Sequence, residues 1–510
     1  MKQPRVLLAI LAAGIALTVK PAYAHGFGER YDLPVPLNLF LAGAAATVAL
    51  SFVVIGFFVR HRAGNFSYPR YNLLKPGLPA AVLTSRVLVT SVRVGSVALF
   101  VLVILTGLIG TNKPVDNLSP TFVWIIWWVG MGYVSALVGN LWMMLNPWKI
   151  TYEWAERLLG ADGGDGALFR YPERWSVWPA MLLFFAFAWT ENVYSSASEP
   201  SQLALLVLLY SLITWAGMAA FGKHQWLRHG EAFSVLFGFF ARFSPTEVRV
   251  ESDRLCRTCD LDCNDSGNGC VDCYRCFELA SSEDRQLNLR PYAVGLGLPE
   301  RVTTARAAFV VLALATVTFD GLQDTPAWAD VQRAFYDAAP GLGPSSIDIV
   351  NTLGLIFAPL LFMLVYLGFS WGIRQMSGTQ ASVADTARAF VFSLVPIALA
   401  YNLAHFMSLL VIQGQLIIPL ASDPFGFGWD LFGSSDYSVN LNAINAKFVW
   451  YASVIAIVLG HIISVYVAHT ISLRSVQDRS GALRGQYPML LLMVSYTASS
   501  LWIIAQPIVN

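Results

Sequence analysis

Apolar runs of 18 or more residues recur along most of this chain of 510 residues. The hydrocarbon core of a bilayer needs roughly 20 apolar residues per helix, and lipid offers no partner to backbone groups that a helix leaves unpaired. Only 13% of the residues are charged, whereas a soluble domain usually carries about 25%. The pattern therefore predicts an all-α, polytopic bundle in contact with the lipid bilayer.

We expect about ten membrane spans. They are placed at residues 36–59, 87–110, 120–145, 176–191, 202–221, 306–320, 351–373, 388–412, 447–470 and 487–507. The first five spans fall within 25–221, a long extramembrane loop covers 222–305, and the last five spans fall within 306–510. The 33 basic and 32 acidic residues nearly balance, which gives no indication of a nucleic-acid partner.

The start of the chain has the pattern of a secretory signal. Lys2 and Arg5 precede the apolar stretch 6–19, and the following Pro-Ala-Tyr-Ala segment at 21–24 supplies small residues for cleavage. We therefore expect residues 1–24 to be a signal peptide. Cleavage would make His25 the first residue of the mature chain.

Lysine and arginine are concentrated in alternate loops, which predicts an orientation. The loops that follow the first, third, fifth, seventh and ninth spans hold most of them. The opposite loops hold little beyond Arg30, Lys113, Arg333 and Lys447. The loop 222–305 is therefore expected in the cytoplasm and both mature termini in the periplasm, in agreement with a leading signal peptide.

Three further features are interpreted as membrane packing. The apolar stretch Ser234–Phe243 is expected to lie at the membrane interface, and Gly132 with Ala136 has the small-xxx-small spacing of a helix contact. Tryptophans of the third span and its flanks are expected to anchor helices at the interface: Trp124, Trp127, Trp128, Trp142 and Trp148.

All six cysteines fall in one stretch of the cytoplasmic loop, with the spacing C-x2-C-x3-C-x6-C-x2-C-x2-C. They are Cys256, Cys259, Cys263, Cys270, Cys273 and Cys276. Clustered thiolates on short turns suit zinc or an iron–sulfur cluster, and structural disulfides are rare in a reducing compartment. We expect a metal site here. The spacing leaves zinc and iron–sulfur both open, because six thiolates exceed the four that one zinc needs.

A second candidate site is expected at the outer ends of the spans, where ionisable groups are costly and often functional. Glu191 ends the fourth span, Asp320 ends the sixth, and His405 lies in the outer third of the eighth, one turn from Asn402. With His25 as a further ligand, they could bind a divalent metal and activate water, or relay protons. Alternatively, His405 is a buried histidine that takes part in a contact between helices, and Glu191 and Asp320 are simply solvated.

Several segments carry a family resemblance. They are His25-Gly-Phe-Gly-Glu-Arg-Tyr-Asp-Leu-Pro-Val-Pro-Leu37, residues 117–128, Gly139-Asn-Leu-Trp142 with Asn146-Pro-Trp148, and Ala404-His-Phe-Met-Ser-Leu-Leu410 with Gln413-Gly-Gln415. The chain resembles bacterial membrane proteins grouped with fenitrothion hydrolase, a membrane-associated organophosphorus hydrolase, over most of its length. No HExxH metalloprotease motif is present.

The resemblance implies an enzyme of the bacterial inner membrane that hydrolyses lipophilic phosphotriesters. Water would attack phosphorus and release a nitrophenolate, which needs an activated water and a polarised P=S or P=O bond. Glu191, Asp320 and His405 are our candidates for catalysis. Two other hypotheses stay open, namely a membrane redox or metal-handling protein that acts through its cytoplasmic cysteines, and a scaffold within a larger membrane complex.

Overall fold

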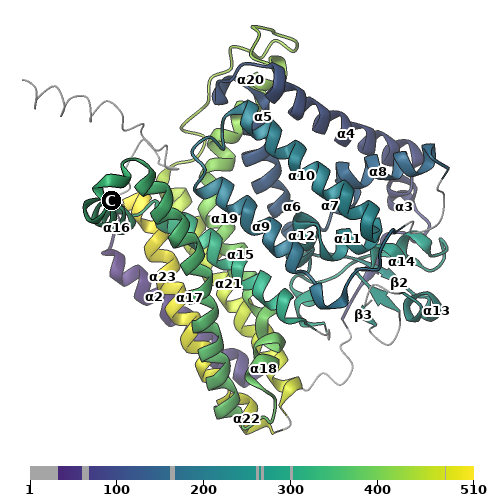
Figure 1. The fold of residues 1–510 in the computed structure, drawn as a ribbon. Coiled ribbons are helices and arrows are strands. Elements are labelled where there is room, and N and C mark those ends of the chain that lie inside the picture. Colours follow the sequence, from purple (N-terminus) through teal and green to yellow (C-terminus); the bar gives the residue numbers. More distant parts are fainter. Residues whose placement is uncertain are drawn as a thin grey trace, which may run out of the picture.

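Helices dominate the computed structural model, which describes residues 33–59, 68–160, 167–259, 264–265, 269–298, 302–476 and 478–509. The expected all-α membrane bundle is confirmed (Figure 1). The signal peptide 1–24 and His25 lie outside the described residues.

Nine helical segments among the described residues are long and apolar enough to cross a membrane. They are α2 (Leu37–Phe58), α4 (Arg86–Ile109), the run Leu118–Leu137 that joins α5 (Leu118–Pro120) to α6 (Gly130–Leu137), α10 (Pro200–Phe221), α15 (Thr304–Gln323), α17 (Ser345–Ser377), the run Val383–Ser422 that joins α18 (Val383–Phe390), α19 (Val395–Ile412) and α20 (Ile417–Ser422), α21 (Ala446–Ser475), and α22 (Arg479–Arg484) with α23 (Gln486–Val509).

The expected fourth span forms a helix that is shorter than a standard span. Helix α9 (Trp178–Asn192) has 15 residues and so rises about 22 Å. It runs alongside α15, because Ser176 Oγ lies 2.7 Å from Thr303 Oγ1 at one end and Gln323 Nε2 donates to the Asn192 carbonyl (3.4 Å) at the other. Helix α9 therefore runs alongside α15 within the bundle, at the position of the expected fourth span.

The remaining elements gather mainly at the two ends of this bundle. The shorter helices are α3 (Leu78–Leu83), α7 (Trp142–Leu145), α8 (Pro147–Leu158), α11 (Lys223–His229), α12 (Ala232–Ala241), α13 (Asp253–Arg257), α14 (Tyr274–Leu279) and α16 (Pro326–Ala338). Figure 1 shows α16, α20 and the C terminus at one end, called here the outer end, and α13, α14 and α22 at the other, called the sheet end.

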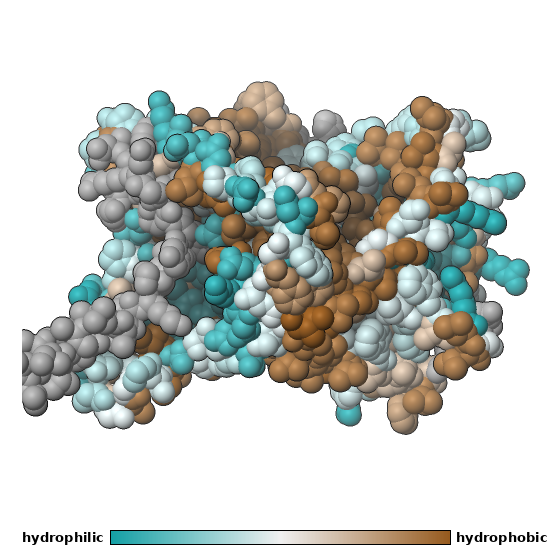
Figure 2. All heavy atoms as spheres, turned by 90° about the horizontal axis from the view of Figure 1, so that it is seen from above, coloured by the Kyte–Doolittle hydropathy of each residue, from teal (hydrophilic) through white to brown (hydrophobic). Residues whose placement is uncertain are grey.

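Burial separates the central helices from those that face lipid. In α15, 72% of the most apolar stretch of 18 residues is buried, against 11% of the corresponding stretches in α2 and α17. Large apolar side chains such as Leu50, Phe57 and Leu364 are exposed. Seen from above, wide hydrophobic patches reach the rim of the molecule (Figure 2). These surfaces are where the bundle contacts the bilayer.

Helix α12 lies within the bundle, and the prediction of an interfacial helix at Ser234–Phe243 is wrong. Every residue of α12 except Gly238 is buried, and the helix packs against α6 and α9. An apolar face all around a helix favours complete burial over an interface position. The expected contact at Gly132 is confirmed, since a Cβ there would lie 3.8 Å from the Phe240 ring.

The prediction that the tryptophans are interface anchors is wrong for Trp128, Trp142 and Trp148. Each is at most 8% exposed and belongs to the main hydrophobic core. Their indole N–H groups donate to buried acceptors, namely Glu191, Glu231 and Ser211. Tryptophan favours an interface because one end of its ring system is polar, and an internal acceptor satisfies that end equally well.

A five-stranded antiparallel sheet covers the sheet end, in the order β1-β5-β2-β4-β3. Its strands are β1 (Tyr71–Asn72), β2 (Thr246–Val250), β3 (Asn264–Asp265), β4 (Cys270–Val271) and β5 (Arg285–Leu289). The sequence analysis did not anticipate this sheet. Strand β1 comes from the loop between the first two spans and pairs Tyr71 with Leu289, so two distant loops form one unit.

Glycine at position 217 allows α10 to contact α11 closely. A Cβ on Gly217 would lie 2.2 Å from the Trp226 ring, and one on Gly230 would lie 2.3 Å from the same ring. We predict that Gly217→Ala lowers the free energy of unfolding by about 1–3 kcal/mol through overpacking. Thermal unfolding in detergent measures this. Gly95→Ala in α4 is the control, because no atom lies within 4 Å of its added Cβ; equal stability of both variants would contradict the packing.

Candidate functional site

The structure brings together the three residues expected at the outer end. Glu191 comes from α9, Asp320 from α15 and His405 from α19. His405 Nε2 lies 2.9 Å from Asp320 Oδ2. Glu191 and Asp320 line the same cavity. We call these three residues the carboxylate–histidine site.

The parallel course of α9 and α15 explains why the two carboxylates lie at the same level. Glu191 is one residue before the end of α9, and Asp320 is three residues before the end of α15. His405 is seven residues before the end of α19, about 10 Å below it. The site therefore lies in the outer third of the bundle, as expected.

Glu191 is held by a tryptophan from an unusual helical segment. Residues Thr121–Val129 form a π-helix between α5 and α6. Trp128 lies in it, and its Nε1 donates to Glu191 Oε1 at 2.7 Å. π-helical segments are rare and frequently occur at functional sites. The indole fixes one carboxylate oxygen of Glu191.

The cavity of the site measures about 20 Å³. This exceeds the roughly 10–15 Å³ that one water molecule requires. Asn192, Thr316 and Asn402 add polar groups to its lining, and Phe184, Leu236 and Phe406 add apolar surface. The cavity can therefore hold one water molecule next to two carboxylates.

Aromatic rings fix the orientation of His405. Its ring stacks on Tyr401 at a centroid distance of 6.0 Å and meets Phe406 edge-on at 4.7 Å. The His405 side chain is 7% exposed and that of Asp320 is 20% exposed. Asp320 is thus the more accessible member of the pair.

The divalent metal expected at this position stays a prediction. Some His, Cys, Asp or Glu side chains among the described residues have ligand atoms within 4.8 Å of one another in groups of three or more. These groups consist of cysteines alone. His25, the proposed further ligand, lies outside the described residues. The arrangement seen here suits proton transfer from water to a carboxylate that a histidine orients.

Five cysteines converge at the sheet end and could hold a metal ion. Two overlapping sets have sulfur atoms within 4.8 Å of one another, with Cys276 common to both: Cys256, Cys270 and Cys276, and Cys259, Cys273 and Cys276. All except Cys259 are buried. Cys263 lies outside the described residues. The expectation that these cysteines form a cluster is confirmed.

One pair within this cluster, Cys256 and Cys270, is joined by a disulfide. The spacing had predicted thiolates at all six positions. Sulfur atoms that converge on one point are close enough either to bond to each other or to share an ion. Cys259, Cys273 and Cys276 form one complete set of neighbouring ligand atoms.

A buried ionic network supports the strands that carry the cysteines. Arg290 Nη1 donates to Glu247 Oε2 at 2.9 Å, and Arg249 Nε donates to Glu247 Oε1 at 3.2 Å. Tyr68 also donates to Glu247, at 2.5 Å. Since β2 pairs Val250 with Cys270, this network fixes the position of a cysteine strand. The alternation in Thr246-Glu-Val-Arg-Val is a period-of-two signal that could have revealed the strand.

Two other sequence features have structural roles. Gly368-Phe-Ser-Trp-Gly372 has the G-x-S-x-G spacing of a nucleophile elbow, but it lies inside α17, and Ser370 Oγ donates to the Tyr366 carbonyl at 2.8 Å. His461, in α21, has its Nδ1 2.8 Å from the Ile457 carbonyl, one turn earlier in the same helix. Neither position shows the geometry of a catalytic group.

No family model, curated protein or solved structure matches this chain. The candidate sites therefore rest on their own geometry.

The ionic network makes the sheet sensitive to acid. Burial alone would raise the pKa of Glu247, but Arg290, Tyr68 and Arg249 outweigh burial and hold that pKa below its usual value of about 4.3. The stability that Glu247 contributes is therefore complete above about pH 4.3 and is lost as the pH falls through the lower folded-state pKa. The protection factors of β2 and β5 amides against hydrogen exchange, which correct for the pH dependence of the intrinsic rate, should fall over that acidic range.

Glu247→Gln should reproduce this loss at neutral pH. Removing one partner of a buried ion pair costs roughly 3–5 kcal/mol. The matched control is Glu251→Gln, whose partner Arg70 lies 3.3 Å away on the exposed surface, and it should cost less than about 1 kcal/mol. Equal exchange rates in the two variants would show that the network does not stabilise the sheet.

Proposed function

We propose that this chain is a membrane-bound hydrolase of lipophilic phosphotriesters such as fenitrothion, and that it acts at the carboxylate–histidine site. One observation carries the proposal: His405 and Asp320 form a hydrogen-bonded pair next to a cavity large enough for one water molecule, which Glu191 also lines. The substrate class comes from the resemblance to the fenitrothion hydrolase group.

The pair can activate water in one defined way. When His405 Nε2–H donates to Asp320, the neutral ring has its acceptor nitrogen at Nδ1. Asp320, which lines the cavity, takes a proton from the water as the oxygen attacks phosphorus, and the His405 N–H orients its carboxylate. The P–O bond to nitrophenolate breaks and the leaving group departs as an anion. Water and triester thus become a phosphodiester, nitrophenolate and protons.

The surroundings suit an apolar substrate. Phe184, Leu236 and Phe240 line the cavity together with the two carboxylates. The cavity of about 20 Å³ holds water and no more, so the triester would approach from the outer end, where Asp320 is partly exposed. A site next to the bilayer gives a lipophilic molecule a short path from lipid.

The test is nitrophenol release from fenitrothion in washed membranes that contain equal amounts of each variant. We expect His405→Ala and Asp320→Asn to lower the rate about 10²- to 10⁴-fold, the usual contribution of a general base. Asp330→Asn is the matched control, because Asp330 pairs with Arg333 on the exposed surface of α16. Full activity of His405→Ala would overturn the proposal.

A second candidate function rests on the cysteines, namely a metal-handling or redox protein. Cys259 Sγ and Cys273 Sγ lie 3.9 Å apart. Four sulfurs that bind one zinc at about 2.3 Å in a tetrahedron lie roughly 3.8 Å from one another. Thiolates on different irons of a cluster stand farther apart. The spacing therefore favours a single zinc ion, held by Cys259, Cys273, Cys276 and one further ligand.

Metal analysis of the purified full chain tests this candidate. We expect about one zinc per chain, and its loss in Cys273→Ser and Cys276→Ser but not in Tyr274→Phe. Zinc-free wild-type protein, or a visible absorption band that dithionite bleaches, would contradict the zinc site. Triester hydrolysis measured on the same variants tells the two candidates apart, because hydrolysis at the outer end does not use the cysteine sulfurs.

A further inference from the structure

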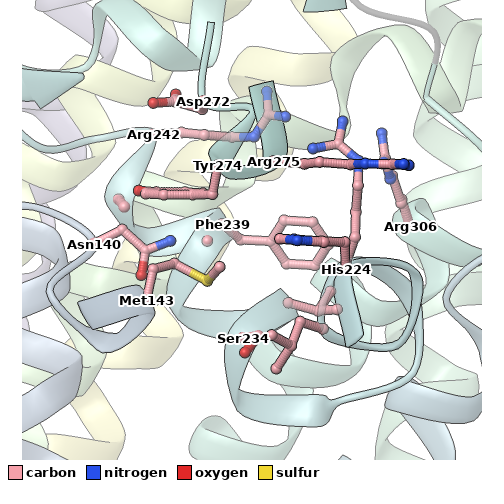
Figure 3. Close-up of a pocket in the computed structure, with 15 residues that line it drawn as sticks. Asn140, Met143, His224, Ser234, Phe239, Arg242, Asp272, Tyr274, Arg275 and Arg306 are labelled. Carbon is pink, nitrogen blue, oxygen red and sulfur yellow. The ribbon is translucent and has the colours of Figure 1, made fainter. Parts of the chain in front are cut away.

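A second pocket lies between the bundle and the cysteine loop, and its volume is about 110 Å³. It is lined by the loop after α6, the helices α7, α11 and α12, the segment 272–275 and the start of α15. In Figure 3, Arg275 and Arg306 lie together on one side above His224, while Asn140 and Met143 lie on the opposite side. The pocket has room for several water molecules or one small anion.

The lining of this pocket is strongly cationic. Among its fifteen described lining residues are four arginines and one aspartate, which gives a formal charge of +3 when His224 is counted as neutral. The arginines are Arg228, Arg242, Arg275 and Arg306, and together they define what we call the arginine pocket. The one carboxylate, Asp272, is shared with a further cation, since Arg290 Nη1 lies 3.9 Å from its Oδ2.

Two observations indicate that the positive potential is maintained by the fold. Arg306 lies in the first turn of α15, where the helix dipole is also positive and opposes a cation. Burial, together with the nearby charges of Arg228 and Arg306, lowers the pKa of His229 to about 3. The fold therefore concentrates positive charge at low solvent exposure, an arrangement that an anion would stabilise.

We propose that the arginine pocket binds a phosphate group, which either a free phosphate anion or an anionic lipid headgroup could supply. Guanidinium groups match phosphate oxygens with paired N–H donors, and such charge-assisted bonds are stronger than neutral ones. The pocket shares none of its described lining residues with the cavity of the carboxylate–histidine site. The proposal thus concerns a second ligand and does not depend on the hydrolase proposal.

The anion site and the cysteine cluster share one short segment. The arginine pocket is lined by Asp272, Tyr274 and Arg275. These residues alternate in sequence with Cys270, Cys273 and Cys276, which converge on the other side. Asp272 has φ +54°, so the segment turns sharply between two cysteines. Whatever fixes the cysteines also fixes Arg275, and anion binding should be coupled reciprocally to the state of the cluster.

The experiment uses the full chain in nanodiscs of neutral phosphatidylcholine, with inorganic phosphate added during calorimetry. We expect phosphate to bind, and Arg275→Gln and Arg306→Gln to bind it at least tenfold more weakly, because each loses charge-assisted hydrogen bonds. Arg70→Gln is the matched control, since Arg70 lies on the exposed surface of the same end and pairs with Glu251. It should bind like the wild type.

A second arm identifies the source of the phosphate. Nanodiscs that contain phosphatidylglycerol should raise the thermal midpoint of the wild type and of Arg70→Gln more than that of the two pocket variants if a headgroup occupies the site. Stabilisation by inorganic phosphate alone assigns the pocket to a soluble anion. No binding of either probe, or equal binding by the pocket variants and the wild type, would overturn the proposal.

Discussion

The interior of this bundle depends on the burial of one short helix, α12, whose N-terminal amides have no water to bind. Glu231 satisfies them from within the protein, with its two carboxylate oxygens 3.0 Å from the Phe233 amide and 2.7 Å from the Ser234 amide. Tyr210 donates to the same carboxylate at 2.5 Å. An apolar helix can stay inside the bundle only when its end is paired in this way.

Helix α12 is the common wall of both pockets, which explains how one chain can hold two separate polar sites. Leu236 and Phe240 face the cavity of the carboxylate–histidine site, whereas Val235 and Phe239 face the arginine pocket. The outer cavity is smaller than the arginine pocket, so the helix separates a water-sized site from an anion-sized one. A change in the cysteine loop can reach the outer cavity through this helix or through α15, whose Arg306 and Asp320 line the two pockets.

The sequence predicted those features that follow from local pattern. Long apolar runs indicated the spans and short cysteine spacings indicated the cluster, whereas the orientation inferred from the alternate basic loops stays a prediction. Glu191, Asp320 and His405 were found because a charge inside a span is rarely tolerated without a role. The position of each residue relative to its span end was enough to place all three at a similar depth, and the parallel course of α9 and α15 supplied the contact.

Features that depend on long-range contacts were missed. The sheet pairs residues as distant as Tyr71 and Leu289, and no local pattern contains that information. From the sequence alone, Trp128 is interpreted as an interface residue, because only the structure shows its acceptor, Glu191. The arginines of the pocket were counted only as evidence of orientation, since their convergence requires the fold.

The central claim of this account is the meeting of three helices around one water. An experimental structure of the protein in a lipid nanodisc tests it most directly. The account predicts density for a water molecule between Glu191 and Asp320, with the His405 ring bonded to Asp320. A His405 ring turned away from Asp320, or Glu191 in a separate cavity, would contradict it.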